Sequence, residues 1–176
     1  KKHFELGLIR NHYVGRTFIE PTQNIRSLGV KLKLSPTKTI VKNKSIILID
    51  DSLVRGTTCH KIIKMLYEAG AKEVHVRIAC PEIKYPDFYG VDMPTEDELL
   101  ANKKTNQEMC EYIKAKSLKF LSLKGLYKAL LGEKRNSNYP QFSDHYFTGD
   151  YPVKPHDNLK GIKVKQLSLL SVKSNS

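Results

Sequence analysis

The sequence predicts an α/β fold with a mainly parallel sheet, because short apolar runs alternate with segments of helical spacing. The clearest unit spans residues 45–80 and reads as strand, helix, strand. Its first strand is the β-branched run Ser45–Ile49, which is too short for a helix and predicts a strand buried on both faces, not an edge strand. In its helix, apolar residues recur every three or four positions after Thr57, and Gly70 is typical of a helix C-terminus.

The other elements continue the same alternation. We expect strands at residues 4–9, 30–34, 74–78 and 118–121. We expect helices at residues 106–116 and 122–131, and a short helix opened by a capping box of Thr95 and Glu98. Residues 10–27 have few periodic apolar positions and predict a long loop, which in a compact domain is often functional.

Two regions differ in apolar density. Residues 1–131 carry all the predicted strands and helices and are expected to form one domain. After Gly132 the apolar residues thin out and turn-forming residues dominate, so residues 132–176 are predicted to be a poorly packed tail.

Composition narrows the class of protein. The 176 residues include 40% hydrophobic residues, enough for a packed core, and carry a formal net charge of +12. This basic excess fits partners that bear phosphate, whether a small substrate or nucleic acid. Cys59, Cys80 and Cys110 form no CxxC pair, which favours a reducing compartment over a disulfide scaffold or a structural zinc site. No apolar run approaches the ~18–20 residues of a membrane span, so we expect a cytoplasmic protein without membrane contact.

The segment from Asp50 to Thr58 carries the strongest signal for chemistry. It places two adjacent carboxylates, Asp50 and Asp51, where a strand ends, and open α/β sheets bind ligands at that edge. A short loop then leads to a predicted helix N-terminus, whose unpaired N–H groups and dipole stabilise a phosphate. Gly56 allows close backbone approach, and neighbouring Ser and Thr hydroxyls add donors. The alternative is a plain polar loop with Thr57 as the helix cap, but the acid pair followed by Gly-Thr-Thr favours the phosphate site.

This segment, DDSLVRGTT, resembles the loop by which type I phosphoribosyltransferases bind 5-phosphoribosyl-1-pyrophosphate (PRPP), in the form found in the amidophosphoribosyltransferase family. Three more segments resemble that family, namely Gly7–Ile19, Glu68–His75 and Tyr89–Pro94. The resemblance covers about residues 4–131, and Phe147–Pro152 is a fainter echo beyond them.

The resemblance implies a type I phosphoribosyltransferase fold and a pentosyltransferase activity. In this family, ammonia released from glutamine displaces pyrophosphate from C1 of PRPP and gives 5-phosphoribosylamine, the first step of purine biosynthesis. It also implies Mg²⁺ as cofactor, PRPP with ammonia or glutamine as substrates, and purine nucleotides as feedback inhibitors.

The match also implies roles for the residues of the loop. Asp50 and Asp51 would act as catalytic residues, holding the ribose hydroxyls and the surroundings of Mg²⁺. PRPP would further be bound by the residues that follow the acid pair, which are Ser52, Leu53, Val54, Arg55, Gly56, Thr57 and Thr58.

The long loop after the first strand resembles the family's flexible loop, which closes over PRPP. Arg10, Tyr13 and Arg16 would be its catalytic residues, and Lys33, on the next strand, is a weaker candidate for binding the pyrophosphate. Arg10 and His12 stand where the family usually has Lys and Arg, and such exchanges are not neutral at a phosphate contact.

The sequence also departs from the family on a larger scale. It lacks the glutaminase domain and an earlier strand and loop of the transferase domain, so we expect a sheet incomplete at its N-terminal side, with an exposed apolar edge and face. Activity with glutamine is then expected to be absent for this chain alone, and a homo-oligomer or a complementing chain is expected. No cysteine follows Cys110, so we predict no iron–sulfur cluster.

Two other functions fit parts of the sequence. A different type I phosphoribosyltransferase would keep the PRPP loop, but the segment at residues 10–18 resembles the amidophosphoribosyltransferases. A catalytically dead module that senses PRPP or binds nucleic acid would use the +12 charge, but the Lys residues are scattered and no aromatic-basic RNA-binding motif is present.

Overall fold

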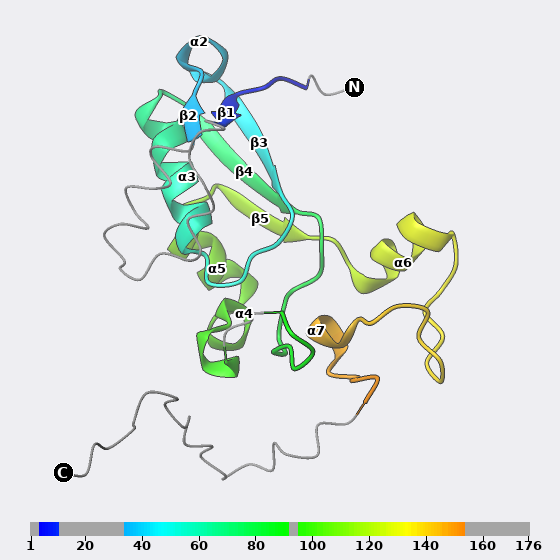
Figure 1. Cartoon of the computed structure of the whole chain (residues 1–176). Coiled ribbons are helices and arrows are strands. Elements are labelled where there is room, and N and C mark those ends of the chain that lie inside the picture. Colours follow the sequence, from blue (N-terminus) through cyan, green and yellow to red (C-terminus); the bar gives the residue numbers. More distant parts are fainter. Residues whose placement is uncertain (1–3, 11–33, 92–94, 154–176) are drawn as a thin grey trace, which may run out of the picture.

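The computed structural model describes residues 4–10, 34–91 and 95–153, and its centre is a parallel sheet (Figure 1). Among the described residues this sheet has three strands in the order β3-β4-β5. The strands are β3 (Ser45–Asp50), β4 (Glu73–Ile78) and β5 (Ser117–Phe120). All three lie within a few residues of the predicted positions, and the α/β fold with a parallel sheet is confirmed.

Two helices cover one face of this sheet, α3 (Thr57–Glu68) and α5 (Asn106–Ile113), as Figure 1 shows. The helical spacing of apolar residues explains why, since it puts Ile63 of α3 and Ile113 of α5 on the side that meets the sheet. Both side chains are fully buried, as is Val76 of the central strand, and they form the centre of the core.

The predicted burial of the first strand on both faces is wrong. Side chains alternate across a strand, and β3 turns Ile46 and Leu48 toward the helices but Ile47 and Ile49 away from them. Ile47 is 45% exposed and Ile49 is 69% exposed. The strand also has only β4 as a neighbour, so it is an edge strand of the described sheet.

Smaller elements surround this centre. Near the beginning of β3 in Figure 1, two short strands pair antiparallel, with Ile9 opposite Ser35. No described helix is long and apolar enough to cross a membrane. The small elements are β1 (Leu8–Arg10), β2 (Leu34–Pro36), α2 (Lys38–Val41), η2 (Glu96–Glu98), α4 (Leu100–Lys103), α6 (Leu123–Leu131) and α7 (His145–Thr148).

The predicted capping box at Thr95 and Glu98 is wrong. The segment forms only the 3-10 turn η2, and the Thr95 side chain makes no capping hydrogen bond. The same Thr-x-x-Glu spacing recurs ten residues later, where Thr105 and Glu108 form a complete capping box at the start of α5.

The described part of the predicted tail, residues 133–153, contains buried polar contacts. Asp144 is 3% exposed and His145 is 1% exposed. His145 Nε2 donates to Asp87 Oδ1 at 2.9 Å, which ties α7 to the segment after β4. The backbone amide of Lys84 donates to the Tyr146 carbonyl in the same contact. The buried contacts of this region are therefore made by Asp144 and His145, whereas most side chains from Glu133 to Ser143 are exposed.

Candidate functional site

The acid pair lies where β3 ends, as the sequence predicts. Asp50 is the last residue of the strand and Asp51 is the first residue of the loop. The backbone amide of Asp51 donates to Asp50 Oδ1 at 3.1 Å, and the Ser52 hydroxyl donates to Asp51 Oδ1 at 3.1 Å. Because β4 is parallel to β3, its own carboxyl end, at Ile78, lies beside Asp50. The two carboxylates therefore stand at the ligand-binding edge of the sheet.

The acid pair makes this edge electronegative. Burial is the largest effect on Asp50 and raises the pKa of its carboxyl group, and the charge of Asp51 raises it further. Burial and the nearby Asp50 charge also raise the pKa of the Cys59 thiol to about 12. Cys80 responds in the same way, with burial and the charges of Asp51 and Asp50 raising its pKa to about 11. Ionisable groups whose pKa is shifted by burial and by a neighbouring charge occur preferentially at functional sites.

The helix that follows the loop starts without a side-chain cap. Gly56 is the N-cap residue of α3, with φ at 75°, and no side chain accepts a hydrogen bond at this position. The alternative in which Thr57 caps the helix is wrong, because Thr57 is already helical. The first N–H groups of α3 thus have no capping side chain, and such groups bind anions.

Gly56 is required for packing behind the loop. A Cβ atom built on it would lie 2.8 Å from Leu100 Cδ2 and 3.0 Å from Tyr112 Cε1. The left-handed φ and this close approach both exclude a side chain. The close approach that the sequence predicts at Gly56 is therefore, on this side, made by Leu100 of α4 and Tyr112 of α5.

We expect Gly56→Ala to destabilise the chain by about 2–5 kcal/mol. The left-handed conformation costs an L-residue about 1–2 kcal/mol, and overpacking adds about 1–3 kcal/mol. Gly132→Ala is the matched control, because Gly132 has φ at 73° and nothing within 4 Å of the added Cβ. Urea unfolding of both variants isolates the crowding at Gly56, and equal losses of stability would show that crowding there is absent.

Three contacts hold the loop from behind. The Leu53 side chain is buried in the core, and the Leu100 amide donates to the Val54 carbonyl at 2.9 Å. Arg55 Nη2 donates to Glu98 Oε2 at 2.7 Å. This hydrogen bond from Arg55 is the main reason why the pKa of Glu98 is lowered. The contacts of the loop with Glu98, Leu100 and Tyr112 are not predictable from the sequence, because no local pattern links residues so far along the chain to the loop.

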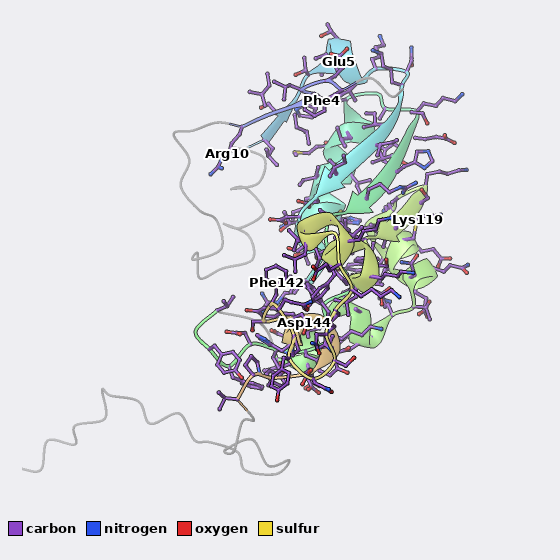
Figure 2. All side chains as sticks on the ribbon, turned by 90° about the vertical axis from the view of Figure 1, so that its right-hand side faces the viewer. Phe4, Glu5, Arg10, Lys119, Phe142 and Asp144 are labelled. Atoms are coloured by element: carbon purple, nitrogen blue, oxygen red, sulfur yellow. The ribbon has the colours of Figure 1, made fainter. Side chains whose placement is uncertain are left out.

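The structure brings only part of the predicted site together. The loop from Asp50 to Thr58 is described in full. Tyr13, Arg16 and Lys33 lie outside the described residues. Arg10 is described as the last residue of β1, exposed, and no hydrogen bond or ion pair joins it to the loop. Figure 2 shows its side chain pointing out from the molecule at the end of β1.

The donor set of the acid pair suits a particular kind of metal site. Among the described residues, no three His, Cys, Asp or Glu side chains gather where they could hold a metal ion. Mg²⁺ needs no such group, because it keeps several waters and is bound by one or two carboxylates together with substrate phosphates. Asp50 and Asp51 supply carboxylates of that type, and the adjacent charge of Asp51 works against the ionised form of Asp50 unless a cation is near.

Comparisons with known proteins agree on one family. The chain is 57% identical to the amidophosphoribosyltransferase of Rhizobium etli over 169 residues, which is 96% of this chain and 34% of the relative. It is 52% identical to the chloroplastic amidophosphoribosyltransferase 2 of Arabidopsis thaliana over 88% of this chain and 27% of the relative. The chain therefore spans about a third of the length of these relatives. No family model matches it.

Solved structures point the same way. The glutamine PRPP amidotransferase of Bacillus subtilis, complexed with ADP and GMP, matches with a TM-score of 0.73 and 46% identity. The match covers 88% of this chain and 34% of that chain. A second structure, of the allosteric regulatory enzyme of purine biosynthesis, has the same TM-score of 0.73 and 47% identity.

Proposed function

This chain is a homologue of the amidophosphoribosyltransferases over about a third of their length, and from that premise we propose that it binds PRPP in the transfer of ammonia to C1 of the sugar. The observation that carries the proposal is the junction of β3 and α3. There the acid pair and an uncapped helix N-terminus are six residues apart. A phosphorylated sugar fits both features, because its hydroxyls need acceptors and its phosphate needs donors.

In this proposal, different residues of the loop bind different parts of PRPP. Asp50 and Asp51 accept hydrogen bonds from the ribose hydroxyls, and their charge stabilises the positive charge that develops on the sugar as pyrophosphate leaves. The N–H groups at the start of α3 and the hydroxyls of Thr57 and Thr58 hold the 5′-phosphate. When bound beside the acid pair, Mg²⁺ would neutralise the pyrophosphate oxygens.

Several partners belong to the same proposal. Ammonia is the proposed nitrogen donor at this site, and glutamine is the proposed source of that ammonia. Purine nucleotides are further ligands, because a nucleoside monophosphate presents the same 5′-phosphate to the start of α3. We also propose contact with PRPP for four residues outside this loop, which are Arg10, Tyr13, Arg16 and, as a weaker candidate, Lys33. We also propose that the active form is a homo-oligomer or a complex with a complementing chain.

Calorimetry with the full 176-residue chain tests the proposal. We expect PRPP to bind in the presence of Mg²⁺ and the binding to weaken when EDTA removes the metal, because the negative charges of the acid pair and of the pyrophosphate are then no longer offset by a cation. Circular dichroism checks that the sample is folded. A folded chain that binds no PRPP with Mg²⁺ present would contradict the proposal. If PRPP does bind, pyrophosphate release that depends on added ammonia would show that the transfer reaction takes place on this chain.

A further inference from the structure

The Arg55–Glu98 ion pair joins the PRPP loop to η2, for which the sequence predicts a helix start and no part in the site. The two side chains meet at 2.7 Å, and each is about half exposed. Arg55 is the only cationic side chain between Asp50 and Thr58, so it is the obvious candidate for direct contact with a phosphate. Yet the Nη2 group of its guanidinium already donates to a carboxylate, and the negative charge of Glu98 offsets part of its positive charge.

The contacts around the pair lie on one side of the loop. Next to Arg55, the Val54 carbonyl accepts from the Leu100 amide, and Gly56 lies against the Leu100 and Tyr112 side chains. Glu98 is the last residue of η2, two positions before Leu100, so the ion pair and the backbone hydrogen bond are made to the same short segment. Together they fix three consecutive loop residues against η2, α4 and α5.

A loop held in this way is preorganised for its ligand. Binding an anion by backbone N–H groups requires them to point in one direction, and a loop that must first order itself loses affinity. The contacts of Val54, Arg55 and Gly56 restrict the residues immediately before α3, where the anion-binding N–H groups begin. The guanidinium of Arg55 is directed to η2 by the same arrangement.

We infer that Glu98 is a positioning residue for the PRPP loop, and that Arg55 acts on PRPP by bracing the loop against η2 instead of by touching a phosphate. The inference rests on the proposed function for its ligand. It assigns to residues 96–100 the task of presetting the loop, and it removes Arg55 from the groups that contact PRPP directly.

A charge exchange separates the two roles of Arg55. Glu98→Gln removes the ionic pair, and we expect PRPP binding with Mg²⁺ to weaken about two- to fivefold, the range for an exposed ion pair. Arg55→Glu should weaken it more, because two carboxylates then face each other. The double variant Arg55→Glu with Glu98→Arg restores an ion pair of opposite direction, and binding should return to within about twofold of the original. A double variant that binds as poorly as Arg55→Glu alone would show that the guanidinium contacts the phosphate, and would overturn the inference.

A second measurement does not need PRPP. The Leu100 amide, which donates to Val54, reports on the brace by hydrogen exchange. We expect its exchange to become about two- to fivefold faster in Glu98→Gln and to recover in the double variant. Glu68→Gln, which breaks the exposed Lys64–Glu68 pair elsewhere on α3, is the control and should leave this amide unchanged. Equal exchange of the Leu100 amide in all variants would overturn the inference. Faster exchange in Glu98→Gln with recovery in the double variant, in a chain that binds no PRPP, would overturn only the proposed function.

Discussion

Asp50→Asn should weaken Mg²⁺-dependent PRPP binding about tenfold to a hundredfold without lowering the melting temperature. A charge-assisted hydrogen bond to the ligand contributes about 1.5–3 kcal/mol, which sets the loss of affinity. Stability should behave differently, because burial and the charge of Asp51 raise the pKa of Asp50 in the folded chain. A raised pKa means that the ionised carboxyl group destabilises the fold once the pH exceeds that pKa, and an amide removes this cost. Calorimetry and thermal unfolding of the same sample measure both effects.

A loss of PRPP binding without a loss of stability would show that Asp50 acts on the ligand and does not stabilise the fold. The amide oxygen of the variant can still accept the hydrogen bond from the Asp51 amide, so the local backbone contact is retained. Asp51→Asn should weaken binding by a similar factor, since Asp51 is the other carboxylate at this edge. Asp150→Asn makes the same chemical change at an exposed residue of the 133–153 region and should leave PRPP affinity unchanged. A drop in melting temperature with intact binding would show that Asp50 has a structural role.

The fold centre is predictable from the sequence because its signals are local. The apolar run that ends at Asp50 and the helical spacing before Gly70 each depend on near neighbours, and both elements appear where predicted. The prediction of a capping box at Thr95 is wrong because the pattern Thr-x-x-Glu covers only four residues. After Glu98 the chain turns extended at Leu99, which is fully buried, and this buried residue ends the turn. At Thr105 the helix continues with apolar residues behind it, and the same pattern forms a real cap.

The site divides along the same line. The acid pair and the start of α3 form a continuous segment, so their order alone predicts a common edge of the sheet. The contacts that hold this loop come from much later in the chain. Glu98 lies 43 residues after its partner Arg55, and Tyr112 lies 56 residues after Gly56. Such pairs leave no periodic trace in the sequence. Gly56 shows the consequence, because the sequence indicates a ligand approach where the structure has packing.

A second large effect is expected at Asp144, whose replacement by asparagine should cost about 3 kcal/mol of unfolding free energy. Asp144 accepts from the Tyr127 hydroxyl at 2.9 Å and forms an ion pair with Arg135. The Asp144 side chain is 3% exposed and that of Arg135 is 19% exposed, so water replaces the lost contacts poorly. Breaking a buried pair on one side costs about 3–5 kcal/mol, and the partial exposure of Arg135 favours the lower end. Urea unfolding of the full chain at neutral pH measures the loss.

Asp150 offers a control on the same guanidinium. It pairs with Arg135 Nη2 at 2.6 Å, but its side chain is 53% exposed, so Asp150→Asn should cost less than about 1 kcal/mol.

The pH dependence of stability gives an independent check on Asp144. Burial by itself raises the pKa of Asp144, but hydrogen bonds from Arg135 and Tyr127 outweigh it and hold the pKa below its ordinary value. The stability from a lowered pKa is present above the unfolded value of about 3.9 and is lost as the pH falls through the folded one. The stability gap between the original chain and Asp144→Asn should therefore stay constant from pH 7 to pH 5 and narrow below about pH 4. A gap that does not change with pH would mean that the carboxylate charge contributes nothing, and that the loss comes from packing alone.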